Sequence, residues 1–248
     1  MKLDVFMSPG ELTSGDVQGR VVAVIDVLRA STSIAVALFN GASTVVPVES
    51  VEDALVATKP FERSQVRLTG ERRMMPIPGF DLGNSPGDFT AEAVSNTTVV
   101  MSTTNGTRAL LGLQGARDVV VAAYVNHAAV SALLRIAVRS NTDISIVCAG
   151  NEGHFSLEDA ACAGRYVRSI TKGAAAAIQN DAACASALID RKYGDNIAKI
   201  FEESTHGQAL AEAGFGDDLA VCAAVDSHSV VPIYQDRQIT RLGPDRER

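Results

Sequence analysis

Three segments of the chain share one pattern, in which a short apolar run leads into a polar loop and then into helix-forming residues. The apolar runs cover 21–26, 98–101 and 144–149, and the helical stretches that follow cover 34–39, 108–113 and 156–170. Short runs rich in Val and Ile are typical of strands that are covered on both faces. Their alternation with helices predicts an α/β fold of three layers (α/β/α) with a parallel or mixed sheet.

The domain organisation predicted from the 248 residues is simple. No linker-like stretch divides residues 1–240, and α/β proteins of this size often form one domain. We therefore predict one α/β domain over 1–240, which could consist of two closely packed lobes. Residues 241–248 are polar and contain Gly243 and Pro244, so we expect them to form a flexible tail.

Charge and composition limit the partners. The net charge is −7, and no cluster of Lys and Arg provides a surface for nucleic acid. A small anionic substrate is still compatible if a few arginines and a metal are gathered in one cleft. No apolar run is long enough to cross a bilayer and the first residues lack a signal-peptide core, so we expect a cytoplasmic protein without a membrane partner. The four cysteines are widely spaced, which predicts reduced, buried thiols.

The polar loops are the expected site. Ligands of open α/β sheets collect beyond the carboxyl ends of strands, where the first turns of helices offer free backbone N–H groups. Each of the three loops also carries residues with stronger chemistry. These are Asp26, Arg29, Ser31 and Thr32 in the first loop, Asn105 and Arg108 in the second, and Glu158 and Asp159 in the third.

The loop over 102–108 is the best candidate for a phosphate cradle. Thr103, Thr104 and Thr107 are small and hydroxylated, Gly106 relaxes the backbone, and Arg108 could fork onto oxyanions. The alternative is a capped helix start with a solvated arginine. That alternative explains one threonine more easily than it explains the whole run.

Asp26 ends an apolar strand, where a carboxylate is costly unless it is paired or binds a metal. Arg29 could be its ion-pair partner or a clamp for the substrate, and the residues leave both interpretations open. The sequence Asp26-Val27-Leu28 lacks the second Asp of the Asp-x-Asp phosphatase loop, which argues against a haloacid-dehalogenase type of enzyme.

An irregular stretch over 70–90 is dense in Gly and Pro, and long irregular stretches are often functional. It contains Glu71, Asp81 and Asn84, whose hard oxygen atoms suit magnesium. Carboxylates in loops are more often simply solvated. The histidines show no spacing typical of metal ligands.

Several of these motifs together resemble the 2-phosphosulfolactate phosphatase family. They follow the order of the family and span nearly the whole chain. The matching blocks are 26–32, 70–72 with 79–86, 103–109, 148–150 with 155–159 and 162–164, and the late segment from 216–219 through Asp226 to 231–234.

The resemblance implies hydrolysis of the phosphate ester of 2-phospho-3-sulfolactate, a requirement for Mg²⁺, a three-layer α/β fold and a homodimer. On this basis we expect Mg²⁺ to lie on carboxylates drawn from Asp26, Glu71 and Asp81. The attacking group stays open, because either a water activated by Glu158 or Asp159, or Asp26 itself, could attack phosphorus.

The remaining site residues are expected to bind the anionic substrate. Arg29, Arg72 and Arg108 would contact its acidic groups. Further contacts are expected from Ser31, Thr32, Asn84, Thr103, Thr104, Asn105, Gly106 and Thr107. The alternative is a non-catalytic binding protein for a small phosphorylated or sulfonated metabolite, which would need the same arginines but fewer carboxylates. A nucleotide-binding protein is disfavoured, because the glycine-rich phosphate-binding motifs are missing.

Overall fold

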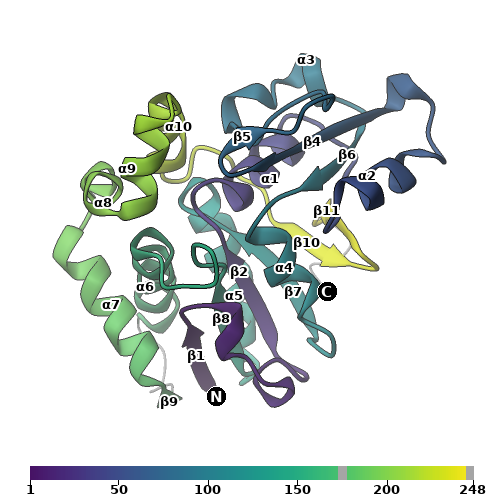
Figure 1. Cartoon of the computed structure of the whole chain (residues 1–248). Helices are drawn as coiled ribbons and strands as arrows, with labels where there is room; N and C mark the ends of the chain where they lie inside the picture. The colour runs from purple at the N-terminus through teal and green to yellow at the C-terminus, as the bar shows by residue number, and fades with distance from the viewer. Residues whose placement is uncertain (173–177, 244–248) are drawn as a thin grey trace.

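The computed structural model describes residues 1–172 and 178–243, apart from the side chain of Arg108. Within these residues, eleven strands form one sheet in the order β5-β4-β6-β3-β11-β10-β7-β2-β8-β1-β9 (Figure 1). The strands are β1 (Lys2–Phe6), β2 (Val21–Ile25), β3 (Thr44–Pro47), β4 (Val66–Arg72), β5 (Met75–Pro76), β6 (Thr98–Ser102), β7 (Asp118–Ala122), β8 (Ile144–Cys148), β9 (Ile178–Gln179), β10 (Pro232–Gln235) and β11 (Gln238–Arg241).

The sheet contains two parallel blocks. In one block β4, β6 and β3 run parallel, and in the other β7, β2, β8, β1 and β9 run parallel. The hairpin β10–β11 lies between the blocks and pairs antiparallel with both, through Ile233 opposite Val120 and Ile239 opposite Val45. Because three antiparallel pairings in succession separate β3 from β7, the two blocks run in opposite directions.

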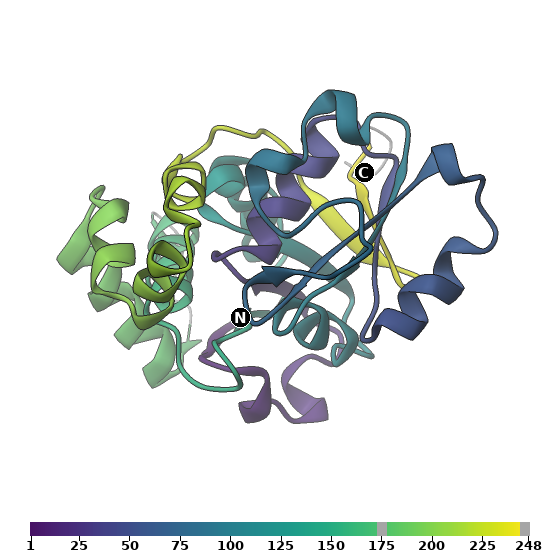
Figure 2. The ribbon, with the colours of Figure 1, turned by 45° about the horizontal axis from the view of Figure 1, so that its top comes forward.

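Helices cover both faces of the sheet. They are α1 (Ala30–Phe39), α2 (Val51–Thr58), α3 (Ala91–Val94), α4 (Gly106–Leu111), α5 (His127–Arg139), α6 (Leu157–Thr171), α7 (Asp181–Tyr193), α8 (Ile197–Glu203), α9 (Thr205–Glu212) and α10 (Gly216–Ala223). Figure 2 shows the green helices of the later chain gathered on one side of the molecule, away from the blue α2.

The side chains of β2 alternate between the two faces of the sheet. Val21, Ala23 and Ile25 point into a core shared with α5, α6 and α7, whereas Val22 and Val24 point into a second core shared with α1 and α4. Every residue of β2 is buried, which is typical of a strand with helices on both faces. The predicted three-layer α/β/α fold with a mixed sheet is therefore confirmed.

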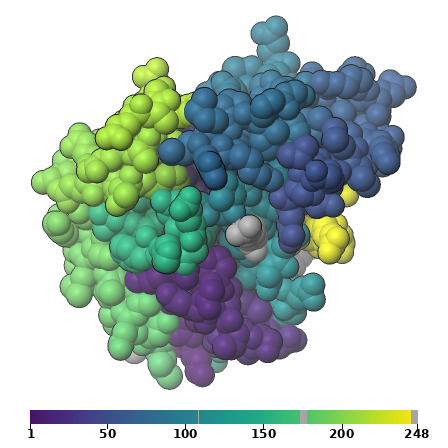
Figure 3. Space-filling view, viewed as in Figure 1, coloured from purple at the N-terminus to yellow at the C-terminus, as the bar shows by residue number. Residues whose placement is uncertain are grey.

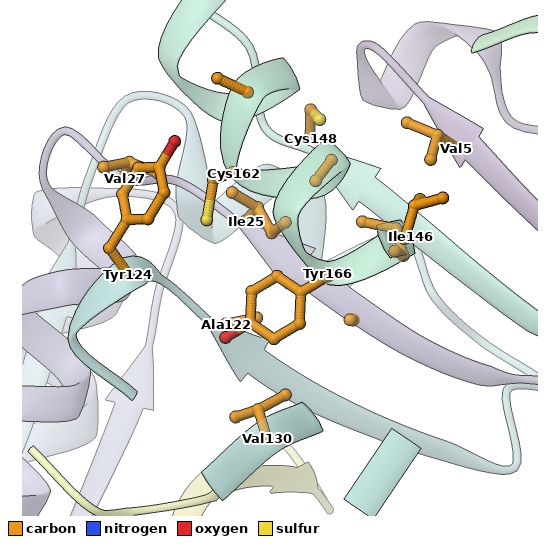
Figure 4. Packing of buried hydrophobic residues seen from close by; sticks show 14 of the residues in the cluster. Val5, Ile25, Val27, Ala122, Tyr124, Val130, Ile146, Cys148, Cys162 and Tyr166 are labelled. Atoms are coloured by element: carbon orange, nitrogen blue, oxygen red, sulfur yellow. The ribbon is translucent and has the colours of Figure 1, made fainter. Parts of the chain in front are cut away.

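The first core contains three tyrosines and three cysteines. Figure 4 shows Tyr124, Tyr166, Cys148 and Cys162 packed around Ile25, and Cys222 belongs to the same core. The hydroxyl of Tyr166 donates a hydrogen bond of 2.9 Å to the carbonyl oxygen of Ala123. Burial raises the pKa of the Cys148 thiol well above its usual range, which suits a packing role. The predicted burial of the cysteines is wrong for Cys184, which is exposed on α7.

The predicted strands and helices of the three repeated units are confirmed within a few residues, because each has the required apolar run. Ser156 begins α6 as expected, with its side-chain oxygen accepting a hydrogen bond from the N–H of Asp159. Several elements were not predicted from the sequence, namely β1, β4, β5, β9, the hairpin β10–β11, α3 and α8 to α10. β11 includes Arg241, the first residue of the predicted tail, and 244–248 lie outside the described residues. No helix in the described ranges has the length and apolar character needed to cross a membrane.

Candidate active site

A cavity of about 320 Å³ lies where the carboxyl ends of strands from both blocks meet. It is lined by Asp26 after β2, Arg73 after β4, Thr103 to Asn105 after β6, and Asn151 after β8. In Figure 3 the surface is hollowed here, between the yellow-green residues of α9 and α10 and the blue residues around β4 and β5. The other lining residues are Leu28, Arg29, Glu71, Met74, Asn84, Glu152, His206 and Ala209.

Asp26 is held at the floor of the cavity by the first turn of α1. Its Oδ1 accepts a hydrogen bond of 3.2 Å from the N–H of Ala30, and its N–H donates to the hydroxyl of Ser31 at 2.9 Å. Burial raises the pKa of Asp26 to about 6, and the charges of Glu71 and Glu158 also raise it, although His206 opposes them. A buried carboxyl group that titrates near neutral pH is the kind of acid–base group that active sites contain.

Ser31 and Thr32 do not line the cavity. The Ser31 N–H donates to the carbonyl oxygen of Asp26 at 2.8 Å, and the Thr32 hydroxyl donates to the carbonyl oxygen of Val27 at 2.9 Å. Both residues therefore fix the turn between β2 and α1. The structure places them behind the site that they were expected to contact directly.

Glu71 and Asn84 reach the cavity from neighbouring segments. The Oε1 of Glu71 accepts a hydrogen bond of 2.8 Å from the N–H of Thr104, and its Oε2 accepts one of 2.9 Å from the N–H of Met74. A parallel bridge joins Thr69 to Leu82, so Glu71 and Asn84 occupy matching positions on two adjacent segments. The Oδ1 of Asn84 is buried and has no hydrogen-bond partner within the described residues.

Arg29 lines the cavity but is committed to a buried ion pair. Its Nη1 lies 2.7 Å from Oδ2 of Asp218, and the side chains are 2% and 9% exposed. Its Nη2 donates to the carbonyl oxygen of Met74 at 2.8 Å, and the guanidinium stacks over the ring of Phe215 at 4.3 Å. The structural salt bridge weighed for Arg29 is therefore present, although its partner is Asp218 on α10 instead of Asp26.

The structure separates two neighbouring arginines. Arg72 ends β4 and donates to the carbonyl oxygens of Glu49, Glu71 and Ser102, so it joins segments outside the cavity. Arg73 lines the cavity, is exposed, and forms no hydrogen bond or ion pair with any side chain that the structure describes. Arg72 was predicted to contact the substrate and Arg73 was not, because the end of β4 cannot be located from the sequence.

The loop after β6 packs directly against Asp26. Thr103 and Thr107 bond to each other through their hydroxyls at 3.2 Å, and the Oδ1 of Asn105 accepts from the N–H of Glu152 at 3.1 Å. A Cβ at Gly106 would lie 2.9 Å from Oδ2 of Asp26 and 2.8 Å from Cβ of Ala30. Gly106 thus permits the close approach that was expected of it, whereas the side chain of Arg108 lies outside the described residues.

Glu158 and Asp159 lie behind the cavity. Asp159 is fully buried and accepts from the N–H groups of Val27 and Gly150, at 2.8 and 3.1 Å. Burial, together with the charges of Asp26 and Glu158, raises the pKa of Asp159 well above its usual range. Glu158 contacts His206, whose Nδ1 lies 3.2 Å from Oε1 of Glu158. His206 lines the cavity and was not selected from the sequence, because no histidine spacing marked it.

The cavity thus brings together seven of the predicted site residues, namely Asp26, Arg29, Glu71, Asn84, Thr103, Thr104 and Asn105. Asp81 is not among them. It pairs with Arg63 and accepts a hydrogen bond of 2.8 Å from the N–H of Leu68. Its carboxylate therefore stabilises the segment beside β4 and lies outside the cavity where the predicted metal would bind.

The fit of a magnesium ion can be judged from the oxygen atoms present. No group of three or more His, Cys, Asp and Glu side chains in the described part of the chain could hold a metal. Magnesium, however, keeps several waters and needs only one or two carboxylates together with substrate phosphate. Asp26, Glu71 and the unpartnered amide oxygen of Asn84 provide such a set of hard oxygen atoms on one cavity. These residues fit the ion.

Comparison with known proteins agrees with this chemistry. Residues 6–237 match the family model described as 2-phosphosulpholactate phosphatase. A protein of Symbiobacterium thermophilum named probable 2-phosphosulfolactate phosphatase is 38% identical over 227 residues, which is 92% of this chain and 96% of that protein. Proteins with the same name from Clostridium botulinum (42% identity, 69% of this chain and 71% of that protein) and Caldanaerobacter subterraneus (43% identity, 66% and 67%) are also similar.

The buried ion pair of Arg29 generates a stability prediction. The variant Arg29→Met leaves Asp218 buried and unpaired, so we expect the free energy of unfolding to fall by about 3–5 kcal/mol. The double variant Arg29→Met/Asp218→Leu should recover most of that loss, because no charge is then left buried. Urea unfolding of the wild type, the single variant and the double variant measures these free energies.

A matched control is Asp195→Asn, since Asp195 pairs with Arg165 at 2.6 Å but its side chain is 99% exposed. That variant should lose no more than about 1 kcal/mol. A double variant as unstable as Arg29→Met would show that the cost does not come from the unpaired charge.

Proposed function

Because the chain belongs to the 2-phosphosulfolactate phosphatase family, we propose that it is a magnesium-dependent phosphoric monoester hydrolase that converts 2-phospho-3-sulfolactate into 3-sulfolactate and phosphate. The observation that carries this proposal is the position of Asp26. Its carboxyl group lies at the end of a fully buried strand, on a cavity that also holds an arginine and an amide oxygen without partners among the described side chains. A phosphate ester with further acidic groups is complementary to that arrangement.

Asp26, Glu71 and Asn84 would hold the magnesium ion, which when bound would neutralise charge on the phosphoryl oxygens. The charges of the side chains that line the cavity support a requirement for a bound cation. Asp26, Glu71 and Glu152 contribute three carboxylates, whereas Arg29 is already neutralised by Asp218 and Arg73 is the arginine left to oppose them among the described lining residues. The carboxylates therefore outnumber the available guanidinium, and a bound cation would reduce their repulsion of an anionic substrate.

Asp26 is the residue that we place at the reacting phosphorus. Of the two bases considered from the sequence, Asp159 has both carboxylate oxygens occupied by backbone N–H groups and Glu158 contacts His206. Neither lines the cavity. Asp26 does, and it titrates near neutral pH because it is buried. It could attack as a nucleophile or accept the proton of an attacking water.

The phosphatase is favoured over a non-catalytic binding protein by the cost of burying Asp26. A binding site for an anion gains nothing from a buried carboxylate, which repels the ligand and destabilises the fold. The same carboxylate is useful when a proton or a phosphoryl group must be transferred. The homodimer and the cytoplasmic location stay predictions.

Phosphate release tests the proposed activity. The protein should release phosphate from 2-phospho-3-sulfolactate when Mg²⁺ is present and lose that activity in excess EDTA. Phosphate is measured colorimetrically, with 2-phosphoglycolate and glycerol 2-phosphate as substrates that lack the sulfonate. Tight binding of the substrate without any turnover would support the non-catalytic binding protein instead.

Replacement of Asp26 tests its role. Asp26→Asn should lower kcat by at least about a thousandfold, because either route needs the carboxylate at phosphorus. The stereochemistry of hydrolysis of a substrate made chiral at phosphorus then separates the routes, since two successive displacements through an acyl phosphate on Asp26 give retention and one direct attack by water gives inversion. An Asp26→Asn variant with near-normal kcat would remove Asp26 from the site.

Replacement of Arg73 tests substrate binding. Arg73→Ala should raise KM for 2-phospho-3-sulfolactate by roughly 10- to 150-fold and change kcat much less, because a charge-assisted hydrogen bond contributes about 1.5–3 kcal/mol. The control is Arg139→Ala, which removes the same charge from the exposed end of α5, outside the cavity. Equal KM values for the two variants would contradict a contact between Arg73 and the substrate.

A further inference from the structure

We propose that His206, held by Glu158, donates the proton that the leaving alcohol oxygen takes up as the phosphate ester breaks, an assignment that rests on the proposed phosphatase activity. Glu158 is a positioning residue in this proposal, because it acts through His206. No sequence motif marked His206. Glu158, which was predicted as a possible base for an attacking water, orients His206 instead.

The geometry of the pair carries the assignment. Nδ1 of His206 lies 3.2 Å from Oε1 of Glu158, which is 1% exposed. This contact fixes the ring and leaves the other nitrogen, Nε2, without a hydrogen bond to any described residue. Nε2 is not buried, so it is accessible to solvent. A carboxylate on one ring nitrogen with the other nitrogen free is the arrangement that proton-transfer histidines need.

His206 also lies on two cavities. It lines the candidate active site together with Asp26, and it lines a neighbouring cavity of about 220 Å³ together with Glu158 and Asn151. Asp26 reaches the active-site cavity from the end of β2, whereas His206 reaches it from α9. A phosphate ester bound between them would have one group for the phosphorus and another for the leaving oxygen.

The charges around His206 favour its protonated form. Burial alone would lower the pKa of His206, but the hydrogen bond to Glu158 and the charges of Glu158 and Asp26 outweigh burial and raise it. The opposing charge is that of Arg29, which is paired with Asp218. The other charged groups that share a cavity with His206 are Glu71, Arg73, Glu152 and Glu203.

The reaction balances with this donor. As the ester P–O bond breaks, its electron pair moves to the alcohol oxygen, which takes the proton from Nε2 of His206. Water supplies the oxygen that ends on phosphorus, either directly or by hydrolysing an acyl phosphate on Asp26. A proton from that water restores His206. An alkoxide is a poor leaving group, so a proton donor is expected to accelerate this ester more than it would an ester of an acidic alcohol.

The test compares His206→Gln with a matched histidine variant. We expect His206→Gln to lower kcat by roughly 100- to 1000-fold on 2-phospho-3-sulfolactate with KM changed less than about threefold. The decline of kcat/KM at high pH should also disappear, because the group that loses its proton there is gone. The control His154→Gln alters an exposed histidine that lines neither cavity, and it should behave as the wild type.

Glu158→Gln distinguishes positioning from simple structural support. Loss of the Glu158 charge should lower the pKa of His206, so the decline of kcat/KM should move to lower pH. The same change is visible without activity, by following the His206 ring nitrogens with ¹⁵N NMR in the wild type and in Glu158→Gln. Unfolding midpoints of all variants show whether each one is folded.

The outcomes separate the two proposals. An active wild type whose His206→Gln variant keeps kcat and the high-pH decline overturns the proton donor and leaves the proposed function standing. A His206 ring that titrates below its ordinary value, or that is insensitive to Glu158→Gln, overturns the pairing on which the donor depends. A wild type that releases no phosphate removes the proposed function, and the proton donor falls with it.

Discussion

The site depends on two blocks of parallel strands that run in opposite directions yet deliver their carboxyl ends to one cavity. Five neighbouring strand pairs separate β6 from β2, and a twist of about 20–25° per pair accumulates to roughly 100–125°. The strands of the two blocks are thereby turned toward each other instead of pointing to opposite edges. The hairpin β10–β11 adds two of the strands that separate the blocks. The last strands of the chain therefore help to determine how the loop after β6 lies relative to Asp26.

The charged and polar groups around the cavity are divided between those that hold the fold and those that remain available to a ligand. Arg29 with Asp218, and Asp159 with two backbone N–H groups, are fully satisfied and fix the loops around the cavity. Asp26, Arg73 and the amide oxygen of Asn84 keep unused bonding capacity. This difference follows from packing, since an acid or arginine loses its availability as soon as a partner of opposite polarity is buried against it.

Some residues of the site are predictable from the sequence, and others are not. Asp26, Glu71 and Asn105 could be placed at the site because each follows an apolar strand or lies in a segment dense in turn residues. Arg72 and Arg73 could not be told apart, because a difference of one residue at the end of a strand reverses the side that a side chain faces. His206 gave no signal at all, since its partner Glu158 lies 48 residues earlier on another helix.

The sequence by itself determined the layered α/β architecture, the strand-to-helix loops and the family, because apolar periodicity and local motifs are properties of neighbouring residues. Only the tertiary structure decided which of the polar residues act together. It paired Arg29 with Asp218, moved Asp81 away from the cavity, and brought Arg73 and His206 into it. These outcomes depend on strand order, sheet twist and the packing of helices that are distant in the chain, and no local pattern of residues encodes them.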